Sequence, residues 1–145
     1  MPVYDRFEPT LAVAPQGAYW VPEGYTHVLD ALREHGVGIA AIASVLPTGS
    51  RVQEFVVDSV TSAARPFQGH RETRVRGHWR AAGPQAASQT GTPPGRGFVV
   101  SGAGRFGPLT AYLLEPESDD GLLDWNFFDS ALAPGKVYPV LRLTP

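Results

Sequence analysis

One segment near the start of the chain limits the possible folds most, because it reads as a strand, a helix and a second strand in succession. Residues 18–21 form a short apolar strand, and apolar side chains then recur at helical spacing over residues 22–35. Gly36 ends that helix, since glycine readily adopts the left-handed conformation found after a helix C-terminus. Residues 37–45 are apolar and partly β-branched, as in a buried strand. This unit predicts a right-handed parallel crossover.

The middle of the chain has the pattern of an antiparallel hairpin. Residues 51–60 and 70–80 are strand-like, and Pro66 and Gly69 favour a turn between them. Because side chains two apart share a face of a strand, the second strand has one polar and one apolar face. The polar face carries His70, Glu72, Arg74, Arg76, His78 and Arg80, and the other carries Thr73, Val75 and Trp79. One wet face and one packed face are typical of antiparallel sheets.

The remaining elements are short. Residues 81–97 are rich in Ala, Gly, Pro, Ser, Gln and Thr, which predicts a mobile loop. Strands are expected at 98–101 and 137–143, and helices at 108–114 and 122–132. We therefore predict an α+β fold in a single domain over residues 1–145. It has a mixed β-sheet, one βαβ crossover near the N-terminus, a central antiparallel hairpin and short C-terminal helices.

Composition excludes several classes of protein. A net charge of -2 argues against a dedicated nucleic-acid binder, which is normally basic. The absence of cysteine excludes disulfides, thiolate metal sites and a cysteine nucleophile. No apolar run approaches the roughly 20 residues that span a bilayer, so no membrane segment is expected. Residues 1–10 lack a basic region followed by an apolar one, which is not the pattern of a signal peptide.

A metal site is the first chemistry to consider. His70 and Glu72 lie on one strand face, about 7 Å apart, and can just bracket a zinc ion. His78 is too far along a straight strand to join them, and the intervening arginines repel a cation. A solvated polar face is therefore the favoured interpretation, and we predict no metal ligand, no cofactor and no catalytic residue in this chain.

A glycine-rich turn at residues 102–107 is a second candidate. Its three glycines resemble a phosphate-cradling loop between a strand and a helix, and Arg105 within it favours an anion. Arg74 and Arg76 form a basic stripe that can bind a carboxylate or phosphate. Two plainer interpretations stay open: a tight turn that needs positive φ, and arginines paired across the hairpin.

Residues 113–129 alternate acidic and aromatic side chains with neither a helical nor a strand period. A segment of this kind folds onto its own domain or onto a partner. If Trp125, Phe127 and Phe128 are exposed together, they form a partner-contact surface, whereas burial makes them part of the core.

Segments spread over nearly the whole chain resemble the region after the catalytic domain in a bacterial subgroup of the zinc carboxypeptidase (carboxypeptidase A-like) family. The distinctive pieces are Leu-Leu-Glu-Pro-Glu-Ser from Leu113 and Trp-Asn-Phe-Phe-Asp from Trp125. The other matching segments are residues 4–10, 18–22, 32–37, 65–70 and 138–143. The chain departs from the family pattern at Gly104-Arg105, where a Gln-Pro pair is expected, which puts a binding role of that turn in doubt.

The resemblance implies a noncatalytic accessory domain that packs on or assists a zinc carboxypeptidase domain, in cis or in trans. The family's zinc motif, His-x-x-Glu, is absent, since no histidine of this chain has glutamate three residues later. The chain by itself is therefore not expected to be an enzyme. If it belongs to a secreted peptidase precursor, it is extracytoplasmic; otherwise it is cytoplasmic.

Three alternatives stay open. The chain can be a free-standing binding module for an anionic ligand, either a peptide carboxylate or a carbohydrate, held by Arg105, Arg74 and Arg76. A small hydrolase requires His70, Glu72 and Asp129 to converge in one deep cleft. A stability domain without any ligand is the simplest alternative.

Overall fold

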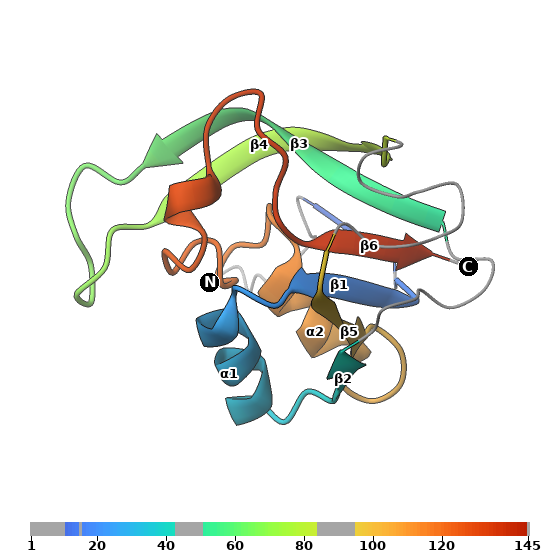
Figure 1. Ribbon diagram of the computed structural model, residues 1–145. Coiled ribbons are helices and arrows are strands. Elements are labelled where there is room, and N and C mark those ends of the chain that lie inside the picture. Colours follow the sequence, from blue (N-terminus) through green and yellow to red (C-terminus); the bar gives the residue numbers. More distant parts are fainter. Residues whose placement is uncertain (1–10, 15, 43–50, 84–94, 145) are drawn as a thin grey trace, which may run out of the picture.

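The computed structural model describes residues 11–14, 16–42, 51–83 and 95–144, and it confirms the α+β class. One six-stranded sheet has the strand order β2-β5-β1-β6-β3-β4 (Figure 1). The strands are β1 (Ala18–Pro22), β2 (Ile39–Ile42), β3 (Arg51–Ser62), β4 (Thr73–Ala81), β5 (Gly97–Ser101) and β6 (Leu141–Thr144). The helices are α1 (Thr26–Glu34) and α2 (Gly107–Leu114), with a 3-10 turn at Asp129–Ala131.

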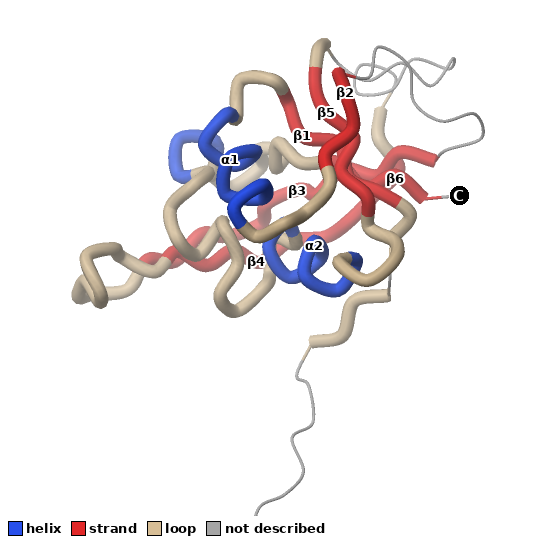
Figure 2. Tube along the Cα trace, turned by 90° about the horizontal axis from the view of Figure 1, so that it is seen from below, coloured by secondary structure: helices blue, strands red, loops and turns tan. Residues whose placement is uncertain are grey.

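Both helices cover the same face of the sheet, as the view from below shows (Figure 2). Tyr19 and Val21 of β1 point to this face and pack with buried residues of both helices. Trp20 points to the opposite face, where it packs with Val52 of β3 and Leu141 of β6. The alternation along β1 therefore divides the core into a large cluster under the helices and a small one behind the sheet.

The crossover prediction is partly correct, and the mixed-sheet prediction is wrong. β1 and β2 both run antiparallel to β5, so they point in the same direction, as the predicted unit requires. However, β5 lies between them, and every hydrogen-bonded strand pair that the structure describes is antiparallel. A strand that comes more than fifty residues after β2 thus separates two strands that are neighbours in sequence.

The predicted central hairpin is confirmed. β3 pairs with β4 in antiparallel register, with a shift between Val57 and Ser59 that leaves Asp58 as the extra residue. Thr73 and Val75 are buried while Arg74 and Arg76 are exposed, as the predicted alternation requires. The hairpin extends beyond the rest of the sheet (Figure 1).

Helix α1 begins at Thr26 rather than at residue 22, because β1 continues through Pro22. It ends as predicted, with Gly36 at a φ of 77°. The predicted helix 108–114 is observed as α2. No helix of the described residues is long and apolar enough to cross a membrane.

The predicted helix over residues 122–132 is wrong. Successive turns occupy most of this segment, and the short 3-10 turn is the only helical part of it. Asn126 adopts a φ of 69°, which a continuous right-handed helix does not allow. The predicted loop 81–97 falls largely on residues 84–94, which lie outside the described residues.

Candidate functional site

Two hollows lie side by side next to α2. The larger, here called the α2 groove, has a volume of about 730 Å³. The smaller, here called the Arg142 pocket, has about 260 Å³ and is lined by Trp79 and Arg142 among others. Leu11, Val13, Glu115 and Glu117 border both hollows. The rest of the groove is formed by Arg76, Gly102, Ala103, Gly104, Gly107, Pro108, Ala111, Tyr112, Ser118 and Asp119.

The glycine-rich turn between β5 and α2 shapes one end of the groove. A Cβ atom on Gly107 would lie 2.4 Å from the carbonyl oxygen of Gly102, so no larger residue fits there. Gly104 has a φ of 72°, as the tight-turn interpretation predicts, and a Cβ atom there would meet nothing within 4 Å. The backbone at Gly104 is therefore bare and can be approached closely.

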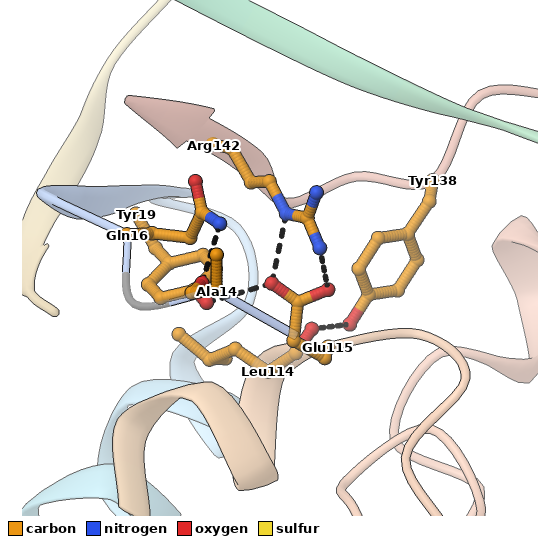
Figure 3. A network of polar contacts seen from close by, with 7 residues as sticks. All are labelled: Ala14, Gln16, Tyr19, Leu114, Glu115, Tyr138 and Arg142. Atoms are coloured by element: carbon orange, nitrogen blue, oxygen red, sulfur yellow. Dashed lines mark hydrogen bonds and ion pairs between the residues drawn. The ribbon is translucent and has the colours of Figure 1, made fainter. Parts of the chain in front are cut away.

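A buried polar network surrounds Glu115, which borders both hollows (Figure 3). Arg142 and Glu115 form a bidentate salt bridge. Arg142 Nε donates to Glu115 Oε1 at 2.8 Å, and an Nη nitrogen donates to Oε2 at 2.6 Å. The Tyr19 hydroxyl donates to Glu115 Oε1 at 2.7 Å, and the Tyr138 hydroxyl donates to the Leu114 carbonyl at 2.9 Å. The network ties the C-terminal end of α2 to β1 and β6.

The surroundings keep the two tyrosines of this network protonated. Burial, followed by the neighbouring Glu115 carboxylate, raises the pKa of Tyr19. Burial also raises the pKa of Tyr138 well above its usual value. Both hydroxyls therefore stay protonated and act as hydrogen-bond donors. The Arg142 guanidinium also stacks on the Trp79 ring, 3.9 Å from the ring centroid. The contacts of Glu115 occupy both of its oxygens, which makes it a structural carboxylate.

Acidic side chains form the outer rim of the α2 groove. Glu117 lies 3.6 Å from Arg76, and Asp119 lies 3.8 Å from Arg74. Tyr112, which is 47% exposed, has its pKa raised by burial and then by the carboxylates of Asp120, Asp119 and Asp124. The carboxylates of this rim therefore act on the Tyr112 hydroxyl.

The structure separates the residues predicted to bind an anion. Arg76 lines the groove, but Arg74 lies beside it and pairs with Glu72 and Asp119. The guanidinium of Arg105 lies 4.9 Å from the centre of the Phe106 ring, and Arg105 is not among the residues that line the groove. Three carboxylates and one guanidinium line the groove, which disfavours an anionic ligand there.

The predicted aromatic contact surface is not continuous. Phe128 is fully buried and packs in the main core, so the prediction that it contacts a partner is wrong. The left-handed turn at Asn126 comes just before Phe128 in the chain. Phe127 is half-buried, and its ring stacks on His27 with centroids 5.5 Å apart. Trp125 is 37% exposed, and its ring stacks on that of His70 with centroids 3.8 Å apart. Its indole N–H donates to the Asp120 carboxylate.

The residues of the metal and hydrolase alternatives lie outside both hollows. Asp129 accepts a hydrogen bond from Asn126 at 3.3 Å, while both ring nitrogens of His70 are buried without a partner among the described residues. Asp124 is 3% exposed, and its pKa is raised by burial and then by Glu72, while Arg74 and His70 oppose the shift. Within the described residues, no three His, Asp or Glu side chains are arranged to hold a metal ion.

Glu115, Arg142 and Tyr112 are the site residues that the sequence analysis missed. A signal existed for Glu115, because it lies between Leu114 and Pro116 in a run where burial is expected, and a buried carboxylate needs a cationic partner. Its partner is 27 residues away in the chain and has no local signature. No model of a known protein family, no curated protein and no solved structure matches this chain.

Proposed function

We propose that this chain is a noncatalytic accessory domain of a zinc carboxypeptidase-like protein and that it packs on the peptidase domain through the α2 groove. The observation that carries the proposal is the gathering of large exposed apolar side chains in one hollow. Leu11, Val13 and Tyr112 are 48%, 38% and 47% exposed and all line the groove. A hollowed apolar surface rimmed by charges is typical of a protein-contact site.

Two further features support an accessory role. Glu115 lines the groove, but both of its carboxylate oxygens accept hydrogen bonds from Arg142 or Tyr19. It therefore stabilises the fold. The glycine-rich turn leaves bare backbone at Gly104, where a partner's main chain can come close. The resemblance to the region after a carboxypeptidase catalytic domain names the class of partner.

The test is a binding measurement between the purified chain and a separately purified zinc carboxypeptidase catalytic domain of the same bacterial subgroup. Isothermal titration calorimetry should show a complex. Tyr112→Ala should weaken binding about tenfold or more, because tyrosine at the centre of an interface often dominates its energy. Phe67→Ala is the matched control, since Phe67 is 61% exposed and does not line the groove.

Binding that Tyr112→Ala and Phe67→Ala weaken equally would contradict the proposed face, and the absence of any complex would contradict the proposed function. The chain incubated with zinc should hydrolyse no peptide carrying a free C-terminus. Zinc-dependent hydrolysis by the isolated chain would show instead that it is an enzyme in its own right.

A further inference from the structure

The interior of the α2 groove is built for an apolar side chain. Pro108, Ala111 and Tyr112 of α2 form one part of its lining, and Leu11 and Val13 form another. Leu11 and Val13 have large apolar side chains, and both are exposed to solvent in the isolated chain. Burying them against a partner removes apolar area from water, at about 25 cal/mol per Å².

The rim of the groove adds a charge requirement. Of its lining carboxylates, Glu115 is already neutralised by Arg142, whereas Glu117 and Asp119 meet, among the described residues, only the guanidinium groups of Arg76 and Arg74, at 3.6 Å and 3.8 Å. The side chain of Asp119 is 82% exposed, and its nearest cation, Arg74, is 3.8 Å away and itself 58% exposed. Such solvated pairs are weak and exchange readily for a partner's cation.

We infer that the α2 groove receives a segment of the partner in which apolar side chains are flanked by lysine or arginine. The apolar side chain packs against Tyr112 and Pro108, and the cation pairs with Asp119 and Glu117 at the rim. This inference rests on the proposed function for the identity of the partner, whereas the chemistry of the segment follows from the lining of the groove.

The first test uses a synthetic probe, so that it does not depend on the peptidase. The acetylated and amidated peptide Leu-Lys-Leu-Arg-Leu is titrated into the isotope-labelled chain, and amide shifts are followed by NMR. Shifts should gather at Gly104, Tyr112 and Asp119. The peptide Leu-Glu-Leu-Glu-Leu should give none there. Equal shifts with both peptides, or shifts elsewhere on the chain, would overturn the inference.

The second test reverses one charge. Asp119→Lys should weaken binding of the basic peptide and of the catalytic domain about tenfold and reduce the dependence on sodium chloride. Asp30→Lys is the matched control: Asp30 is also an exposed aspartate beside an arginine, but it lies on α1 and does not line the groove. Should the two variants bind equally well, the inference fails.

The two proposals fail in different ways. A chain that binds the catalytic domain but is indifferent to Asp119→Lys and to the basic peptide keeps its proposed function and loses this inference. A chain that binds the basic peptide at the groove but not the catalytic domain keeps the inference and loses the proposed partner. Binding to neither overturns both.

Discussion

At the scale of single residues, the pair of Glu115 and Arg142 connects two distant parts of the chain. Their side chains are 6% and 12% exposed, so water screens the interaction little. The Tyr19 hydroxyl and the Trp79 ring complete the surroundings of the two charges. A buried pair of this kind adds little compared with an apolar replacement of both partners, but losing one partner leaves a buried charge alone.

We therefore expect Glu115→Gln to lower the free energy of unfolding by about 3 kcal/mol, because it strands the Arg142 guanidinium in the interior. Urea denaturation followed by circular dichroism measures the change. Glu23→Gln is the control, since Glu23 pairs with Arg96 at the surface and its loss should change stability by less than about 1 kcal/mol. Equal losses in the two variants would show that the buried pair has no special role.

Asp124 gives a prediction of pH dependence. Its pKa is raised in the folded protein, chiefly by burial, so folding favours the protonated carboxyl. The resulting stability is present at low pH, below the unfolded value of 3.8, and is lost as the pH rises through the raised pKa. Asp124→Asn removes the ionisation and should stabilise the protein at neutral pH.

That advantage should shrink as the pH falls toward 3.8, where the wild-type carboxyl becomes protonated in both states. Urea denaturation of the two proteins in parallel, at neutral pH and at a pH just above the acid-unfolding region, measures it. A variant that is less stable at neutral pH, or whose advantage grows in acid, would contradict the burial of an ionised Asp124.

At the scale of secondary-structure elements, the long hairpin of β3 and β4 depends on a glycine in its middle. Gly77 faces Val57 across the ladder, next to the bulge at Asp58. A Cβ atom on Gly77 would lie 2.1 Å from the carbonyl oxygen of Val56 and 2.6 Å from the ring of Phe55. The absent side chain lets the buried Phe55 ring pack over the strand.

Gly77→Ala should therefore destabilise the protein by about 2 kcal/mol or more, because neither the backbone carbonyl nor the packed ring can move aside easily. Gly83→Ala is the matched control, since a Cβ atom there meets nothing within 4 Å. Thermal unfolding of both variants checks the difference. If the two melt at the same temperature, β3 and β4 are not packed as described.

Other elements show where local patterns were reliable. The apolar spacing of α1, the stop at Gly36 and the two faces of β4 all follow from short-range rules, and all are observed. The expected helix over residues 122–132 followed from the same kind of rule and is wrong. There, contacts with the core and with the hairpin outweigh helix propensity: Asn126, for example, donates to the Arg71 carbonyl at 2.8 Å.

At the scale of the whole molecule, the sheet places early and late parts of the chain side by side. β6 lies between β1 and β3, and β5 lies between β1 and β2, so the last described strands fill positions among the first ones. The α2 groove arises from the same arrangement. It combines Leu11 and Val13 with Arg76 of β4, the glycine-rich turn, α2 and the segment after α2.

The sequence by itself determined the α+β class, most of the strands, both described α-helices and the polar face of β4, because each depends on a period of two or on helical spacing within a few residues. Only the tertiary structure decided the strand order, the partner of Glu115, the burial of Phe128 and the existence of the α2 groove. These depend on which distant segments bury one another's apolar surfaces, and that choice leaves no local period in the chain.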